Sequence, residues 1–228
     1  MEGQKNVKLE VIKRFVEQKD EEDLNKCLST LMEKSTPIGL GGNAEVFELS
    51  DPHFGEICVK KIHKTPQLRC NSEEEEFAFQ EEIEDLGVRV PRLIAYVQNP
   101  ETKDKFIIME KILGPSFNDI LEKGVSIPEN YNHAFFWKKL MEYLKIMHDG
   151  NIYHRDLHRG NIMIDKDGGP VIIDFGTAGR AWGSEDDPYK ESVPMLDKET
   201  GTYRLSYQFQ KDEGKASWTK DEIAKKLA

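Results

Sequence analysis

Residues 154–161 read His-Arg-Asp-Leu-His-Arg-Gly-Asn, and residues 174–176, which begin thirteen positions beyond Asn161, read Asp-Phe-Gly. A carboxylate at Asp156 can orient an acceptor hydroxyl and take its proton. Asn161 and Asp174 offer the hard oxygen atoms that Mg²⁺ prefers. Because Asp174 directly follows the apolar run at 171–173, we expect a strand to hold its carboxylate in place. These residues predict a site that combines a general base with a divalent cation.

The two stretches fit H-R-D-L-x-x-x-N and D-F-G, and on them the chain resembles the protein-kinase-like superfamily over roughly residues 37–178. The resemblance implies ATP and Mg²⁺ as cofactors, Asp156 as the catalytic base, and Asn161 and Asp174 as metal ligands. It also implies an α+β, bilobal protein-kinase-like fold. We expect a small antiparallel β-sheet N-lobe, a hinge near residues 110–115 and a reduced, mainly helical C-lobe.

Residues 39–46, Gly-Leu-Gly-Gly-Asn-Ala-Glu-Val, resemble the glycine-rich loop that covers the phosphates of ATP. Alanine stands where the third glycine is usual, and the residue at the loop tip, Asn43, is not aromatic. Both departures are similar to those of the RIO-type atypical kinases. On this resemblance the nucleotide would contact Gly39, Gly41, Gly42, Ala44 and Val46.

Residues 57–60, Ile-Cys-Val-Lys, resemble V-A-I-K, which implies that Lys60 lies on a strand and contacts the α- and β-phosphates. Two glutamates are candidates for its ion-pair partner. Glu76-Phe77, followed by Gly-Val-Arg-Val-Pro at 87–91, resembles a run of RIO-type kinases, and that register selects Glu76. Counting back from Pro91 by the common eukaryotic spacing selects Glu81 instead, so the sequence leaves both open.

Residues 109–112, Met-Glu-Lys-Ile, resemble the hinge that binds adenine. On this resemblance Met109 would back the adenine pocket. The Glu110 carbonyl and the Ile112 amide would meet the edge of the base. The expected catalytic set is therefore Asp156, Lys60, Asn161 and Asp174, with Glu76 as a further nucleotide-site residue.

Three features concern the substrate. His158 stands where serine/threonine kinases usually carry a lysine, and residues 158–161 are similar to antibiotic and choline kinases. Arg155 matches conventional protein kinases, and we expect it to pair with the acids at 185–187 and not with a phosphate group. No A-P-E follows Gly176. We favour phosphorylation of protein serine or threonine hydroxyls. The alternatives are a small-molecule hydroxyl kinase and a nucleotide-binding scaffold or slow ATPase that acts through a partner.

The chain divides by pattern into an N-terminal helical extension (1–35), a kinase N-lobe (36–112) and a minimal C-lobe (113–228). Apolar residues at helical spacing predict two amphipathic helices within 6–34. Strands are expected at 44–49, 57–62, 93–97, 106–109, 162–164 and 171–173, and helices at 72–86, from about 129 to 148, and at 221–227. Ser126 and Glu129 predict a capping box for the second of these helices.

The net charge of −10 excludes a broad basic face, so we expect no nucleic-acid partner. Apolar runs are too short to cross a bilayer, and we expect no membrane partner. The three cysteines lack C-x-x-C spacing and indicate reduced thiols in a cytoplasmic protein. The oligomeric state is left open.

Overall fold

A computed structural model describes residues 10–14, 22–23, 39–40, 44–62, 71–180, 195–196, 203–204 and 207–228. These residues form two compact units. The first comprises the described residues up to Ala78 together with Pro91–Lys111, and the second comprises Phe79–Val90 and the described residues from Ile112 onward. The sequence-based boundaries keep 79–90 with the first unit. The structure groups them with the second because Ile83, Val88 and Val90 are buried in its core.

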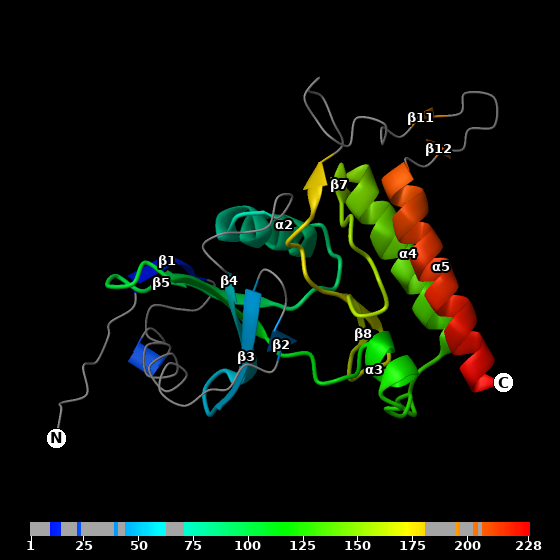
Figure 1. The fold of residues 1–228 in the computed structure, drawn as a ribbon, viewed down its shortest axis with the longest axis horizontal. Helices are drawn as coiled ribbons and strands as arrows, with labels where there is room; N and C mark the ends of the chain where they lie inside the picture. Colours follow the sequence, from blue (N-terminus) through cyan, green and yellow to red (C-terminus); the bar gives the residue numbers. More distant parts are fainter. Residues whose placement is uncertain are drawn as a thin grey trace. The chain divides into compact units, whose positions relative to one another are not determined.

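The first unit is built on one antiparallel sheet (Figure 1). Its strand order is β1-β5-β6-β4-β3-β2. The strands are β1 (Glu10–Arg14), β2 (Gly39–Leu40), β3 (Ala44–Asp51), β4 (Gly55–Ile62), β5 (Leu93–Gln98) and β6 (Lys105–Glu110). The four strands expected within 44–109 are thus present, each within one or two residues of its predicted ends.

Successive side chains along each strand point to opposite sides of the sheet, and both sides carry apolar residues. Ile57 and Val59 of β4 are fully buried and pack with Val97, Phe106 and Ile108, among others, on one face. The other face carries a smaller cluster of Ala44, Phe77, Leu93, Tyr96 and Ile107. Because side chains two residues apart point to the same side of a strand, this second face also receives Lys60 of β4.

Residues 10–14 were expected to be helical, and that expectation is wrong. They form β1, which pairs antiparallel with β5 through Glu10↔Gln98 and Val11↔Val97. Val11 packs on the sheet core, whereas Ile12 is 48% exposed. The strand satisfies the backbone groups of β5, which would otherwise be an open sheet edge. Apart from residues 10–14 and 22–23, the predicted helices of 6–34 lie outside the described residues.

The second unit is mainly helical. Its helices are α3 (Phe117–Glu122), α4 (His133–Asp149) and α5 (Tyr207–Leu227), and it shares α2 (Glu73–Asp85) with the first unit. Short antiparallel pairs accompany them: β7 (Ile152–Tyr153) with β10 (Gly179–Arg180), β8 (Ile162–Ile164) with β9 (Pro170–Ile172), and β11 (Met195–Leu196) with β12 (Tyr203–Arg204). The predicted α+β, bilobal kinase-like fold is confirmed.

The starts of α3 and α4 correct the predicted helix boundaries. The capping box belongs to α3, where Ser116 Oγ accepts from the Asp119 amide and the Asp119 carboxylate accepts from the Ser116 amide. Helix α4 begins later than expected, because Pro128 and Tyr131 form a turn first. Its N-cap is Asn132, whose side chain accepts from the Phe135 amide at 2.9 Å.

Helix α5 is much longer than the predicted 221–227. It runs beside α4 (Figure 1), and its buried residues Ala216 and Ile223 join the same core cluster as Phe136 and Leu140 of α4. Lys226 Nζ donates to the carbonyl of Ile120 at 2.5 Å, which ties the end of α5 to α3. Because this segment is mostly polar, its sequence pattern does not predict the full length of the helix.

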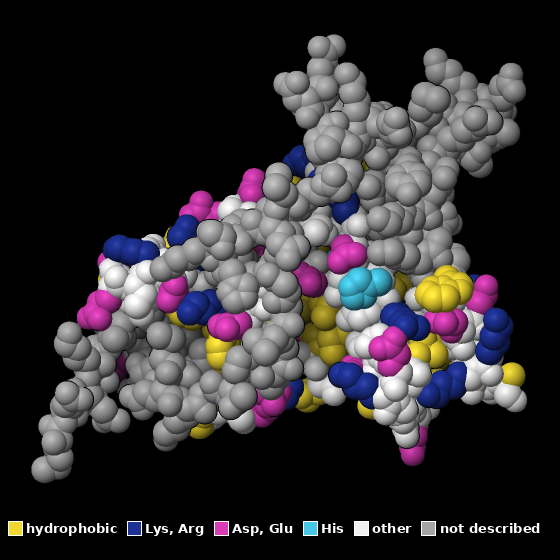
Figure 2. Space-filling view, in the orientation of Figure 1, with side chains coloured by type: hydrophobic (Ala, Val, Ile, Leu, Met, Phe, Trp, Pro, Cys, Tyr) yellow, Lys and Arg dark blue, Asp and Glu magenta, His cyan; other side chains and the backbone are white. Residues whose placement is uncertain are grey.

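Figure 2 shows Lys and Arg side chains interspersed with Asp and Glu over the described part of the face that it draws. The described ion pairs agree with this mixture, for example Lys139 with Glu142 and Lys145 with Asp149 on α4. Within the residues that the structure covers, no helix is both long and apolar enough to span a membrane.

Candidate active site

Lys60 and Glu76 form a buried ion pair in the first unit. Lys60 of β4 is 8% exposed and Glu76 of α2 is 2% exposed. The Lys60 Nζ lies 2.5 Å from the Glu76 Oε1. Taking two charges out of water is costly, and close pairing offsets that cost. Of the two glutamates left open by the sequence, the structure pairs Glu76 with Lys60.

The start of α2 fixes the position of Glu76. The Ser72 amide donates to Glu75 Oε2 at 2.9 Å, and the Glu75 amide donates to Ser72 Oγ at 3.3 Å. This reciprocal arrangement satisfies backbone donors that the first turn leaves without helical partners. The first turn consists of glutamates at 73–76, and negative charge is favourable at this end of the helix dipole. Glu76 therefore projects from a well-anchored helical turn.

Several of the predicted nucleotide-site residues share one face of the sheet. Val46 lies opposite Lys60, and Cys58 lies opposite Met109. Residues that face each other across antiparallel strands point to the same side, as do residues two apart on one strand. Ala44, Val46, Lys60 and Met109 are consequently on the same face of the sheet.

The remaining nucleotide-site candidates are distributed differently. Gly39 lies on β2 opposite Val46, whereas Gly41 and Gly42 lie outside the described residues. The Glu110 amide donates to the Arg92 carbonyl at 2.9 Å, and the Glu110 carboxylate accepts from the Arg92 amide at 3.2 Å. Ile112 is 8% exposed and belongs to the second unit. The boundary between the units therefore falls within the segment expected to be the hinge.

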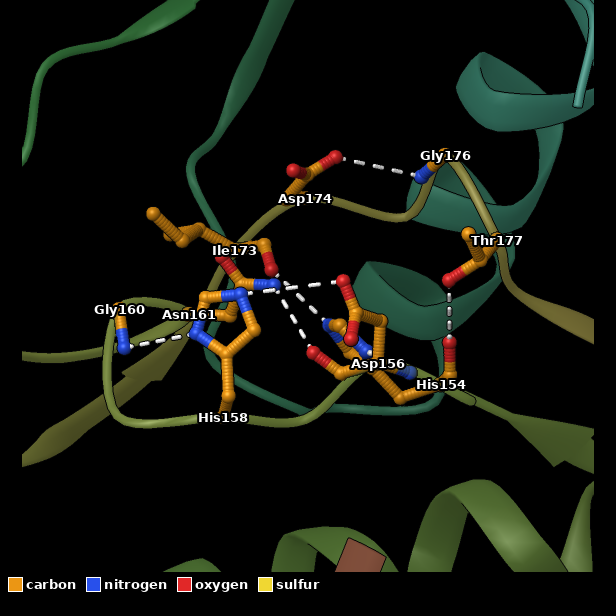
Figure 3. A network of polar contacts seen from close by, with 9 residues as sticks. All are labelled: His154, Asp156, His158, Gly160, Asn161, Ile173, Asp174, Gly176 and Thr177. Carbon is orange, nitrogen blue, oxygen red and sulfur yellow. Dashed lines mark hydrogen bonds and ion pairs between the residues drawn. The ribbon is translucent and has the colours of Figure 1, made fainter. Parts of the chain in front are cut away.

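In the second unit, His154 organises the backbone around Asp156 (Figure 3). Its ring is fully buried. Nε2 lies 2.9 Å from the Ile173 carbonyl, and Nδ1 accepts from the Asp156 amide at 3.3 Å. Because a carbonyl can only accept, Nε2 donates to it and carries a proton. The Thr177 hydroxyl donates to the His154 carbonyl at 3.1 Å, which joins the segment after the Asp-Phe-Gly sequence to the same loop.

Asn161 is held close to Asp156. Its side-chain Nδ2 donates to the Asp156 carbonyl at 2.9 Å, and its own carbonyl accepts from the Ile173 amide at 3.1 Å. The side chain is nearly buried, with the residue 6% exposed. With the nitrogen engaged, Oδ1 is the Asn161 side-chain atom suited to a cation. The Asp156 side chain is 45% exposed, so an acceptor molecule can reach its carboxylate.

Asp174 has an unusual backbone conformation, with φ of 66°. Non-glycine residues seldom adopt positive φ, and they keep it where the surrounding structure enforces it. The next residue, Phe175, is fully buried, and its ring centroid lies 5.2 Å from that of His154. The Asp174 Oδ1 accepts from the Gly176 amide at 3.4 Å (Figure 3).

The oxygen donors of this unit fit Mg²⁺ bound together with a nucleotide. Among the described residues, no group of three or more His, Cys, Asp or Glu side chains could hold a metal ion. Mg²⁺ does not need such a group, because it keeps several waters and commonly uses one or two carboxylates together with substrate phosphates. A carboxylate from Asp174 and an amide oxygen from Asn161 match that requirement.

A set of contacts around Arg155 was not foreseen. Arg155 has φ of 69°, and its Nη2 donates to the Arg180 carbonyl at 2.9 Å. A side chain at Gly179 would collide with the guanidinium, since a Cβ there would lie 2.2 Å from the Arg155 Cζ. Arg180 in turn makes two hydrogen bonds to the Glu82 carboxylate of α2, at 3.1 and 2.5 Å. The acids at 185–187, expected as partners of Arg155, lie outside the described residues.

Helix α5 also contacts the loop at 154–161, which carries Asp156. Arg159 forms ion pairs with Glu122 of α3 and, at 3.4 Å, with Glu222 of α5. Its guanidinium lies 5.9 Å from the centre of the Trp218 ring, within the range of a cation–π contact. Residues that are far apart in sequence make these contacts, and no local motif signals them.

Comparison with known proteins identifies the family. The model of the family described as "Protein kinase domain" matches residues 32–204. The match includes Lys60, Glu76, Asp156, Asn161 and Asp174, whereas α5 lies beyond it. The chain belongs to the protein kinase domain family.

Curated relatives agree with this assignment. Sperm motility kinase 3A of Mus musculus is 40% identical over 145 residues, which cover 61% of this chain and 27% of the relative. A probable serine/threonine-protein kinase of Corynebacterium glutamicum is 31% identical over 153 residues, covering 62% and 22%. A serine/threonine-protein kinase of Nostoc is 30% identical over 160 residues, covering 64% and 27%. The matches span about a quarter of the length of these relatives.

Proposed function

We propose that this chain is an ATP- and Mg²⁺-dependent kinase that transfers phosphate to serine or threonine hydroxyls of proteins. The observation that carries the proposal is the buried Lys60–Glu76 pair, with Nζ and Oε1 2.5 Å apart. A lysine so deeply buried holds its ammonium in a fixed place, which suits the binding of phosphate oxygens. The buried glutamate pairs with this ammonium and holds it in position.

In this proposal the second unit supplies the remaining chemistry. Asn161 and Asp174 would hold Mg²⁺, which when bound neutralises charge on the nucleotide phosphates. Asp156 orients the acceptor hydroxyl and takes its proton, a role that its exposed carboxylate and clamped backbone support. Ala44, Val46 and Met109 line the side of the sheet on which Lys60 lies, and would contact the nucleotide.

Two of the relatives described above are named serine/threonine-protein kinases, which supports a protein hydroxyl as the acceptor. The test is incubation of the chain with Mg²⁺ and ATP labelled at the γ-phosphate, together with generic protein acceptors. Labelled phosphoserine or phosphothreonine is the expected product. Label on an added aminoglycoside or choline, with none on protein, would replace the proposal by small-molecule phosphorylation. Release of inorganic phosphate without any labelled acceptor would replace it by ATP hydrolysis.

The chain provides a matched control for Lys60. Lys61 is the next residue on β4 and pairs with Asp104 at 3.3 Å, but its side chain is 31% exposed. Lys60→Met should abolish most phosphate transfer, whereas Lys61→Met should retain it. Equal losses in the two variants would contradict the role given to Lys60.

A further inference from the structure

The imidazole of His158 is held in one orientation beside Asp156 (Figure 3). The Gly160 amide donates to His158 Nδ1 at 2.9 Å. On the opposite side of the ring, His158 Nε2 lies 3.7 Å from Asp156 Oδ2. The ring therefore lies between the Gly160 amide, to which it is hydrogen-bonded, and the carboxylate that we assign as the base.

These contacts determine where the proton of His158 lies. A backbone amide can only donate, so Nδ1 must accept and carries no proton. A neutral imidazole then has its proton on Nε2, the nitrogen that faces Asp156. A protonated imidazole would carry a hydrogen on Nδ1 as well, and this hydrogen would oppose the Gly160 amide. The contact with Gly160 accordingly favours a neutral ring that presents an N–H donor to the carboxylate.

Gly160 provides the space that this ring position needs. A Cβ at residue 160 would lie 2.7 Å from His158 Cε1 and 3.0 Å from Nδ1. Its next nearest neighbour, the Asn118 Cβ, would be 4.0 Å away. Gly160 does not have a positive φ, so the backbone itself accommodates alanine. An alanine at this position would therefore act mainly by displacing the His158 ring.

We propose that His158 is a positioning residue, whose Nε2–H orients the Asp156 carboxylate to receive the proton of the acceptor hydroxyl. The inference rests on the proposed role of Asp156 as the base. The separation of 3.7 Å is long for a hydrogen bond, but such contacts in active sites often shorten when substrate binds. A neutral imidazole orients the carboxylate without placing a permanent positive charge beside it, which a lysine at the same position would do.

The kinetic test compares His158→Leu, His158→Gln, Gly160→Ala and the double variant His158→Leu/Gly160→Ala in the full chain. His158→Leu should lower kcat about 5- to 10-fold, the scale of one partly exposed polar contact. KM for ATP and Tm should stay unchanged, because the side chain is 45% exposed. His158→Gln should recover most of kcat, since its amide can place an N–H near the position of Nε2. Wild-type kcat in His158→Leu would overturn the proposal.

The double variant separates positioning of the ring from a general disturbance of the loop. Gly160→Ala should lower kcat about as much as His158→Leu, and combining the two should cause no further loss, because both remove the same contact. Multiplied losses in the double variant would overturn the proposal. His53→Leu, in the exposed turn between β3 and β4, is the control for loss of a histidine and should keep the wild-type rate.

A spectroscopic readout is independent of enzyme activity. In the full chain with ¹⁵N-labelled histidine, NMR should show His158 protonated at Nε2 and not at Nδ1. Gly160→Ala should abolish this preference. A wild-type ring protonated at Nδ1 would overturn the inference even if the chain is an active kinase. Absence of phosphate transfer by the wild type, with protonation at Nε2 retained, would instead refute the proposed function, and with it the positioning role of His158.

Discussion

Removing the Glu76 carboxylate should destabilise the protein in proportion to the burial of its partner. Glu76→Leu leaves the ammonium of Lys60, a residue 8% exposed, without its carboxylate at 2.5 Å. Breaking a buried pair from one side costs about 3–5 kcal/mol. At roughly 2–4 °C per kcal/mol for a chain of this size, Tm should fall by about 6–20 °C. Thermal unfolding followed by circular dichroism measures this change.

The chain offers two comparisons for this variant. Glu74 lies on the same helix and pairs with Lys105 at 2.6 Å, but its side chain is 65% exposed. Glu74→Leu should therefore cost less than about 1 kcal/mol. The double variant Lys60→Met/Glu76→Leu removes both buried charges and should recover most of the lost Tm, because apolar side chains can replace a buried ion pair at little cost. Phosphate transfer should stay absent in the double variant.

Equal decreases in Tm for Glu76→Leu and Glu74→Leu would contradict this prediction. A double variant less stable than Glu76→Leu would contradict it as well. Either result would mean that burial of the Lys60 charge does not determine the stability of this region.

Three further predictions concern stability and regulation. Deleting residues 1–14 removes β1 from the edge of β5 and should lower Tm measurably; an unchanged melting curve would contradict a structural role for β1. Burial lowers the pKa of His148 to about 3 from an ordinary value near 6.5. Below pH 6.5 the unfolded chain therefore binds a proton that the folded chain does not. The contribution of neutral His148 to stability is complete above pH 6.5 and is lost as the pH falls toward 3. His148→Phe should reduce the loss of unfolding free energy between pH 6.5 and 4 by up to roughly 3 kcal/mol in denaturant titrations, and an unchanged pH dependence would show that His148 does not cause it. Because Arg155 already donates to the Arg180 carbonyl, phosphatase-treated protein should keep its full initial rate, whereas a lag that disappears after incubation with ATP would indicate activation by phosphorylation.

The candidate site residues could be selected from the sequence because they stand in short local motifs. Asp156 and Asn161 lie on one loop, Asp174 lies just after β9, and the structure holds these segments together through Ile173 and His154. The sequence could not decide whether Glu76 or Glu81 pairs with Lys60, because both glutamates lie on one acidic helix. Only the packing of α2 against β4 decides which of them contacts Lys60.

The errors have physical causes that a local pattern cannot resolve. Val11 occurs at helical spacing from Val7 and Phe15. Residues 10–14 are nevertheless too few to distinguish the apolar period of a helix from that of a strand, and pairing with β5 makes them a strand. Helix α3 has only six residues, and its S-x-x-D capping signal at Ser116 stands in a segment for which no helix was expected. The Arg180–Glu82 pair joins residues 98 apart in the sequence.

We propose that Asp174 binds the metal ion that accompanies the nucleotide, whereas Asp156 orients the acceptor hydroxyl and takes its proton. The most direct measurement is Mg²⁺-ATP affinity alongside phosphate transfer from labelled ATP, in folded Asp174→Ala and Asp156→Asn proteins. We predict that Asp174→Ala loses both Mg²⁺-dependent nucleotide binding and transfer, and that Asp156→Asn binds nucleotide like the wild type but loses turnover. Wild-type transfer by Asp174→Ala, or equal losses of nucleotide affinity in the two variants, would contradict the account.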